Sequence, residues 1–198
     1  MLILGGLPAC GKDTVRAILV KQYNMLPVVR YTTRGMRKNE VDGDAYHFIS
    51  KEKFLAMREE GKFVEYEEFK TALSPEILYY GSTSEDYGDN SVTIISPTGI
   101  SMLKNSPVKD DVFVALLYVP EYEVRNRLVE RKWSNEEIER RIPFDKERYK
   151  NINQYVNCVT PCYTSAYPPE RVAEIVYRWY QSELKKKNSK SSILEGSL

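Results

Sequence analysis

The sequence predicts an α/β fold in which a parallel sheet is flanked by helices. Apolar runs at 2–4, 91–96 and 112–119 are typical of short strands buried inside a sheet. Amphipathic helical segments alternate with them, one beginning at Thr14 and the last opening at 168–169. Strands that alternate with helices in this way indicate crossover connections within one parallel sheet.

Composition narrows the class of protein. The 198 residues, of which 42% are hydrophobic and 29% charged, suffice for one folded domain with a sizeable core. A formal charge of +1 provides no overall field for attracting nucleic acid or an anionic membrane. The first apolar run is too short for a membrane span or a secretion signal. We therefore expect a cytoplasmic monomer or homodimer that binds small molecules, with neither nucleic acid nor membrane as a partner.

The middle of the chain mixes extended and helical segments. Strands are predicted at 27–31, 45–49 and 63–69. Ser50 can cap a helix that runs through Glu60, and 121–132 is a charged helix candidate. Ser134 and Glu137 have the spacing of a capping box, which predicts a further helix after them.

A glycine-rich loop joins the first strand to the first helix. Residues 6–12 match the spacing G-x-x-x-x-G-K. Such glycines let successive backbone N–H groups point at phosphate oxygens, and the helix N-terminus adds its positive dipole end. This predicts a P-loop NTPase core with Lys12 as a catalytic residue. The expected ATP-binding residues are Gly6, Leu7, Pro8, Ala9, Cys10, Gly11, Lys12, Asp13 and Thr14.

The residue after Lys12 departs from the common pattern. Most such loops place Ser or Thr there as a magnesium contact, whereas here Asp13 takes the place and the hydroxyl falls on Thr14. We expect Mg²⁺ to accompany ATP and assign no protein ligand to it. The side chains of the three cysteines and of the only histidine are assigned structural roles: Cys10, Cys158, Cys162 and His47.

The stretch 31–48 combines two arginines with a glutamate and a tyrosine. Guanidinium groups at Arg34 and Arg37 suit the charged head of a phosphate monoester. Glu40 can hold one guanidinium in place, and Tyr46 offers a hydroxyl. These residues predict an anion site, while the alternative is a solvated basic loop.

With this stretch the chain resembles the guanylate kinase family. The pattern T-T-R, a second arginine three residues on, and E-V-x-G-x-x-Y-x-F are matched, and F-V-E-Y and Y-Y-G-S follow at 63–66 and 79–82. The resemblance implies that Glu65 and Ser82 face the base. A carboxylate can accept from both N1–H and the exocyclic amine of guanine, so Glu65 is the expected specificity residue; the alternative is a strand glutamate facing water. The expected acceptor-binding residues are Arg34, Arg37, Glu40, Tyr46, Glu65, Tyr80 and Ser82.

The similarity continues through charged segments that look like the mobile lid of this family. Arg131 and Arg141 are expected to be catalytic cations delivered on closure, the alternative being charged helix faces with internal salt bridges. The resemblance implies a single domain with an inserted acceptor-binding lobe and a small helical lid. Its expected parts are a core at 1–28, 85–123 and 146–187, a lobe at 29–84, a lid at 124–145 and a disordered tail at 188–198.

Three features depart from the family pattern. Arg30 stands where a small hydroxyl residue usually helps to read guanine. Ile94 and Ser96 replace the two acids of an aspartate-rich strand end. The stretch between Glu65 and Tyr80 is longer than usual and includes the pair at 74–75, so this edge of the lobe must be rebuilt.

These observations predict ATP-dependent phosphoryl transfer to a nucleoside monophosphate, with GMP or dGMP first and a modified nucleotide as an alternative. G-K-D in the loop, R-Y-x-T-R at 30–34 and the missing acids also resemble ribose 1,5-bisphosphate phosphokinases. A third alternative is a non-catalytic guanylate-kinase-like binding module. The intact Gly11, Lys12 and Thr14 argue against that alternative.

Overall fold

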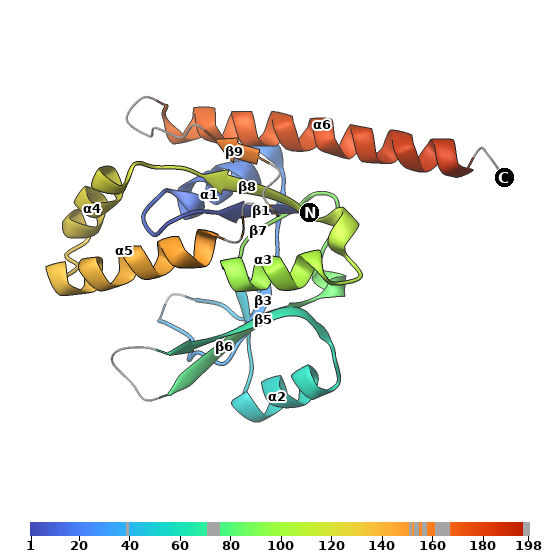
Figure 1. Cartoon of the computed structure of the whole chain (residues 1–198). Helices are drawn as coiled ribbons and strands as arrows, with labels where there is room; N and C mark the ends of the chain where they lie inside the picture. The colour runs from blue at the N-terminus through green and yellow to red at the C-terminus, as the bar shows by residue number, and fades with distance from the viewer. Residues whose placement is uncertain are drawn as a thin grey trace.

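The computed structural model describes residues 1–38, 40–70, 76–150, 152, 155, 158–160 and 167–195, without the side chains of 158–160 and 190–195. Within these residues the chain forms a five-stranded sheet and a four-stranded sheet. Figure 1 shows the second sheet on the side of the first that carries α3, with α6 lying across the opposite side. The arrangement confirms the predicted α/β class.

The five-stranded sheet is the core of the fold. Its order is β2-β7-β1-β8-β9, and every pairing in it is parallel. The strands are β1 (Leu2–Gly5), β2 (Leu26–Pro27), β7 (Ser91–Ile94), β8 (Phe113–Leu117) and β9 (Cys158–Thr160). The predicted apolar runs therefore form the central strands β7, β1 and β8.

Helices cover both faces of this sheet. The helices are α1 (Lys12–Tyr23), α3 (Pro97–Lys104) and α6 (Pro169–Glu195). Leu2 and Leu4 pack into one hydrophobic cluster with residues of α1 and α6, while Ile3 packs into a second cluster with Ile100 and Leu103 of α3. Side chains of a strand alternate between faces, so a strand covered on both sides must be apolar throughout.

The four-stranded sheet, with the order β4-β3-β6-β5, forms a separate lobe where acceptor binding was predicted (the acceptor lobe). Its elements are β3 (Arg30–Thr32), β4 (Tyr46–Phe48), α2 (Lys51–Glu59), β5 (Phe63–Lys70) and β6 (Ile77–Thr83). The side chain of Ser50 accepts a hydrogen bond from the backbone N–H of Lys53 and caps α2, as predicted. Phe54 of α2 stacks on Phe63 with ring centroids 4.4 Å apart, which fixes the helix on the sheet.

The lobe is held to the core by close packing of β5 against α3. A Cβ atom on Gly99 would lie 2.4 Å from a methyl group of Ile95 and 2.8 Å from a carboxylate oxygen of Glu65. Only glycine therefore fits at this point of α3. The contact brings Glu65 against the core of the molecule.

Two further helices lie between β8 and β9 in the part of the chain that the structure describes: α4 (Glu121–Glu130) and α5 (Asn135–Lys150). The 3₁₀ turns η1 (Ser84–Asp86) and η2 (Lys109–Asp111) precede β7 and β8. Ser134 accepts from the backbone N–H of Glu137 at 3.2 Å, as expected for an N-cap. The side chain of Glu137 pairs instead with Arg140, so only half of the predicted capping box forms. Helix α5 also continues past residue 145, the predicted end of the lid, to Lys150.

The carboxyl-terminal prediction needs correction. The tail was expected to be disordered from residue 188, whereas α6 continues to Glu195. Ser189 donates to the backbone carbonyl oxygen of Lys185 one turn earlier at 2.9 Å, and Lys186 pairs with Glu183. The inserted pair at 74–75, Cys162 and residues 196–198 lie outside the described residues. Across the described ranges, no helix combines the length and apolar character that a membrane crossing requires.

Candidate active site

The phosphate loop lies between the end of β1 and the start of α1. Gly6 and Gly11 have φ values of 138° and 94°, in the region that favours glycine. A Cβ atom on Gly6 would lie 2.5 Å from the carbonyl oxygen of Leu117, so this position also admits no side chain. The ammonium group of Lys12 donates to the carbonyl oxygens of Gly6 and Leu7, both at 2.8 Å. The loop therefore curls around the ammonium group of Lys12.

Two long-range contacts hold this loop. The hydroxyl of Tyr149, at the end of α5, accepts from the backbone N–H of Gly6 at 2.8 Å and donates to its carbonyl oxygen at 3.0 Å. Burial raises the pKa of this hydroxyl, so it remains a donor. Arg127 of α4 donates to the carbonyl oxygen of Ala9 at 3.0 Å and pairs with Glu123. Sequence reasoning did not assign either contact.

The outer side of the loop borders a pocket of about 360 Å³. Thr14 and Arg131 line it together with Arg127. Asp13 is exposed in the first turn of α1. The predicted Arg131 therefore lies beside the loop and next to the start of α1.

The predicted anion site is built around Arg34. Its guanidinium donates two hydrogen bonds to the carboxylate of Glu40, at 2.7 and 2.9 Å, and Glu40 also accepts from the backbone N–H of Arg37 at 2.8 Å. Hydrogen bonds from Arg34 and from that N–H lower the pKa of Glu40 to about 2. The guanidinium lies 5.5 Å from the ring centre of Tyr46, which in turn lies 5.9 Å from the ring of Tyr80. The structure thus brings Arg34, Glu40, Tyr46 and Tyr80 together, while Arg37 exposes its side chain.

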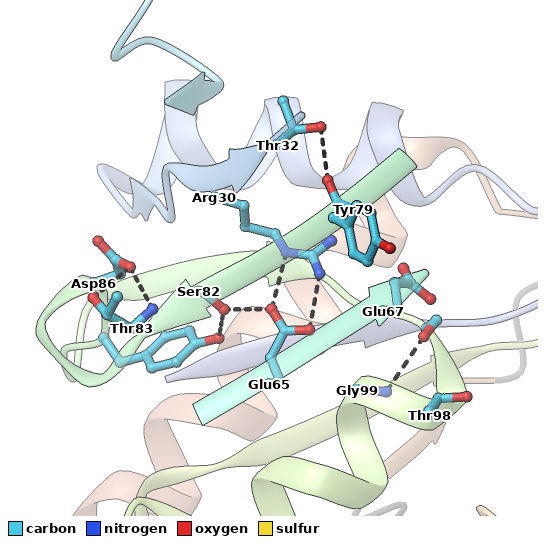
Figure 2. A network of polar contacts seen from close by, with 12 residues as sticks. Arg30, Thr32, Glu65, Glu67, Tyr79, Ser82, Thr83, Asp86, Thr98 and Gly99 are labelled. Carbon is cyan, nitrogen blue, oxygen red and sulfur yellow. Dashed lines mark hydrogen bonds and ion pairs between the residues drawn. The ribbon is translucent and has the colours of Figure 1, made fainter. Parts of the chain in front are cut away.

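Glu65 lies in a buried polar network (Figure 2). Its carboxylate accepts from Arg30 Nε at 3.1 Å and from Nη2 at 2.8 Å. Ser82 donates a short hydrogen bond to the same carboxylate, and its oxygen also lies within hydrogen-bond distance of the hydroxyl of Tyr87. Glu65 has no exposed surface, and burial raises the pKa of its carboxyl while the charge of Arg30 acts against this.

The predicted contact of Glu65 and Ser82 with the base stays a prediction, and in the structure both side chains bond within this network. The alternative, a strand glutamate facing water, is wrong, because the carboxylate of Glu65 is buried under a guanidinium. The physical reason is the departure at Arg30, because a cation there supplies Glu65 with an ion pair inside the protein. Arg30 itself borders the neighbouring cleft.

The cleft has a volume of about 390 Å³ and is lined by the phosphate loop, the acceptor lobe and α5. Its walls include Gly6, Pro8, Lys12, Arg30, Tyr46, Glu67, Tyr80, Arg141, Asp145 and Arg148, and its floor includes Ile94, Ile95, Ser96 and Pro97. Lys12 and the tyrosines of the anion site therefore share one space. The two predicted phosphate-binding regions open onto the same cleft.

Comparison with known proteins decides the family. The family model described as Guanylate kinase matches residues 1–111. A guanylate kinase of Clostridioides difficile is 32% identical over 163 residues, which cover 78% of this chain and 76% of that protein. One of Lactococcus lactis is 32% identical over 157 residues, with the same shares covered. The chain belongs to the guanylate kinase family. The predicted enzyme class, a guanylate kinase-like nucleoside monophosphate kinase, is thereby confirmed.

The fold comparison agrees. The crystal structure of the guanylate kinase from Anaplasma phagocytophilum has a TM-score of 0.64 against this structure. The similarity covers 92% of this chain and 85% of that one, at 18% sequence identity. The predicted P-loop architecture with a separate lobe is therefore the guanylate kinase fold.

The two arginines that were predicted to lie on a lid line different pockets of this family member. Arg141 lines the cleft and donates to the buried Asp145 at 2.7 Å, whereas Arg131 lies in the pocket beside Thr14. Arg148 also lines the cleft, where it lies 3.6 Å from the carboxylate of Glu67. Helical spacing could have predicted that 141, 145 and 148 share a face, and strand alternation could have predicted Glu67 beside Glu65.

The end of β7, where the two acids of the family pattern are replaced by Ile94 and Ser96, has a structural role in this guanylate kinase family member. Ser96 caps α3 by accepting from the backbone N–H of Gly99 at 3.3 Å, and Pro97 occupies the first turn of that helix. Ile94 and Ser96 form part of the cleft floor. The floor is therefore uncharged where the family pattern carries acids.

Proposed function

We propose that this protein transfers the terminal phosphate of ATP to a nucleoside monophosphate, with GMP and dGMP as the first candidates. The observation that carries the proposal is the common cleft, which Lys12 enters from the phosphate loop and Tyr46 and Tyr80 enter from the lobe. Two anionic phosphates held at these places would be brought together for in-line transfer.

The donor would bind at the phosphate loop as ATP with Mg²⁺. The carboxylate of Asp13 and the hydroxyl of Thr14 both follow Lys12 in the first turn of α1, and hard oxygen ligands are those that Mg²⁺ prefers. These two residues fit a role in holding the ion, which would neutralise charge on the phosphates. Lys12 would leave the carbonyl oxygens of Gly6 and Leu7 to bind the outer phosphates.

The acceptor phosphate would bind at the cluster of Arg34, Tyr46 and Tyr80, with Glu40 holding the guanidinium in place. Arg37 would join this cluster by turning its exposed side chain inward. Arg141 would supply positive charge to the transferred phosphoryl group from the lid side of the cleft. No general base is needed, since positioning and charge neutralisation carry most of this chemistry.

The structure weakens the support for ribose 1,5-bisphosphate as the acceptor. A second phosphate would need an available cation, but the charge of Arg30 is balanced by the buried carboxylate of Glu65. Glu67 adds a negative charge to the same cleft. A neutral base is easier to accommodate beside this group of charges than a second phosphate.

The test is ADP release from ATP and Mg²⁺ with a panel of acceptors: GMP, dGMP, AMP, CMP, dUMP and ribose 1,5-bisphosphate. We expect GMP or dGMP to give the highest kcat/KM. A preference for the bisphosphate would overturn the proposal, and binding of nucleotides without turnover would favour a binding module. The cytoplasmic location and the oligomeric state stay predictions.

A further inference from the structure

The side chain of Lys12 bonds to its own loop in the structure. Its ammonium group has three N–H donors. The acceptors are the carbonyl oxygens of Gly6 and Leu7, both at 2.8 Å, and the sulfur of Cys10 at 3.6 Å. Since all three donors have partners in the loop, a nucleotide phosphate can bind Lys12 only when some of these contacts are given up. Donor binding is therefore an exchange of hydrogen-bond partners.

This exchange is unfavourable unless the two released carbonyl oxygens keep another donor. Gly6 is buried, and a buried carbonyl oxygen without a partner costs free energy because it has also lost water. Leu7 keeps a donor from within the loop, since the backbone N–H of Cys10 donates to its oxygen at 3.4 Å. Gly6 keeps a donor from outside the loop, the hydroxyl of Tyr149 at 3.0 Å. Both carbonyl oxygens would thus remain bonded after Lys12 had moved.

The hydroxyl of Tyr149 is held in place by the packing of its ring and by a second hydrogen bond. The ring packs against the hydrophobic cluster on the α3 face of the sheet, and a Cβ atom on Gly5 would lie 3.6 Å from it. The hydroxyl accepts from the backbone N–H of Gly6 at 2.8 Å, so its oxygen meets both the donor and the acceptor of one residue. The O–H bond is therefore directed at the Gly6 carbonyl whether or not Lys12 is present.

We propose that Tyr149 is a positioning residue for the donor nucleotide: its hydroxyl keeps the Gly6 carbonyl hydrogen-bonded when Lys12 turns to the outer phosphates of ATP. Tyr149 acts on the donor through Lys12 and does not itself bind the phosphates. A residue at the end of α5, far from the glycine-rich motif in the sequence, thereby takes part in donor binding. This inference rests on the proposed function, because it takes the ligand of the loop to be ATP.

The test measures the Kd for ATP with Mg²⁺, in the absence of an acceptor, for the parent and for Tyr149→Phe. The variant keeps the packed ring and removes the hydroxyl. The Gly6 carbonyl then depends on Lys12, so the departure of the lysine becomes more costly. We expect the Kd for ATP to rise by about tenfold, as for the loss of one hydrogen bond, and the Kd for GMP to stay unchanged. With GMP as acceptor, KM for ATP should rise by the same factor while kcat stays close to the parental value.

Tyr180→Phe is the matched control. Tyr180 of α6 is buried, and its hydroxyl also donates to a distant backbone carbonyl, that of Asp89 at 2.6 Å. Neither residue is among the described ones that line the cleft or the pocket beside the loop. The melting temperature should fall by a similar amount in both variants, but ATP binding should weaken only in Tyr149→Phe. Equal weakening in both would reduce Tyr149 to a contribution to stability and overturn the inference.

A double-mutant cycle tests whether Tyr149 acts through Lys12. In Lys12→Ala no ammonium group has to leave Gly6, so adding Tyr149→Phe should leave the Kd for ATP unchanged. A hydroxyl that only maintained the shape of the loop would matter equally with or without the lysine. A further loss of affinity of similar size in the double variant would therefore overturn the inference. NMR titration suits this cycle, because it measures Kd values into the millimolar range.

The design distinguishes this inference from the proposed kinase activity. If the parent phosphorylates GMP but Tyr149→Phe keeps the parental Kd and KM for ATP, the inference fails and the kinase stands. If no acceptor is phosphorylated, yet Tyr149→Phe weakens ATP binding only when Lys12 is present, the kinase proposal fails and the role of Tyr149 is supported.

Discussion

The phosphate loop and the acceptor lobe each contain a predicted anion site, and the two sites are built from different kinds of groups. The loop uses backbone groups and one lysine, all within residues 6–14, so its conformation follows from glycines at fixed places. The lobe uses side chains from separate strands, and its central pair, Arg30 and Glu65, is 35 residues apart in the sequence. The conformation of a site made from local backbone groups depends little on the neighbouring side chains. A side chain, by contrast, can be given a new ion-pair partner by a single substitution nearby.

Removing Lys12 tests the loop side of this comparison most strongly. We expect Lys12→Ala to lower kcat by about 10³-fold or more, because the transferred phosphoryl group loses a cation. The melting temperature should change little, since Lys12 bonds to two carbonyl oxygens and, at 3.6 Å, to the sulfur of Cys10, all within the phosphate loop. Steady-state kinetics and thermal melts measure both quantities.

Lys21→Ala is the matched control, because Lys21 is an exposed lysine in the last turn of the same helix. Its kcat should equal that of the parent. Turnover by Lys12→Ala close to the parental rate would show that the loop does not hold the donor as proposed.

Breaking the buried ion pair between Arg30 and Glu65 tests the acceptor lobe in this comparison. Glu65→Ala should reduce the free energy of unfolding by about 3–5 kcal/mol, because the charge of Arg30 would be left buried without its partner. Glu68→Ala breaks the exposed pair with Arg58 and should cost about 1 kcal/mol or less. Urea denaturation measures both values. Equal small losses would mean that Arg30 reaches water when Glu65 is removed.

The two predicted lid arginines, Arg131 and Arg141, line different pockets, so their replacement should have different effects on the kinetics. Arg141→Ala should lower kcat by about 100-fold, as expected when a group that stabilises charge in the cleft is lost. Arg131→Ala should instead raise KM for ATP by about tenfold, through loss of one charged hydrogen bond beside the loop. Initial rates with each substrate varied in turn distinguish the two. The reverse pattern would place Arg131 at the transferred group.

The smallest effect concerns Glu40, whose pKa of about 2 lies below its ordinary value of 4.5. A lowered pKa in the folded state means that the ionised carboxylate contributes stability in full above about pH 4.5 and loses it as the pH falls toward 2. Carbon-13 NMR of the carboxyl should show no titration between pH 5 and 8. In Arg34→Ala the midpoint should move back toward 4.5; an unchanged midpoint would remove Arg34 as the cause.

Features built from residues close in the sequence could be predicted, whereas contacts between distant segments could not. The central strands, the loop around Lys12 and the Arg34–Glu40 pair were predictable, since each depends on neighbours close in sequence. The partner of Glu65 was not predicted, because Arg30 comes from another strand. Tyr149 was not predicted at all, because a lone hydroxyl on a helix gives no sign of the glycine it binds 143 residues away.

The contact between Tyr149 and Gly6 also has a mechanical consequence. It ties the carboxyl end of α5 to the loop, while Arg141 lies eight residues earlier, roughly 12 Å along the helix axis. A rotation of α5 by about 10° around this contact would move Arg141 by roughly 2 Å and leave Gly6 in place. The position of the Arg141 guanidinium in the cleft therefore depends on the orientation of α5, which Tyr149 anchors at the phosphate loop.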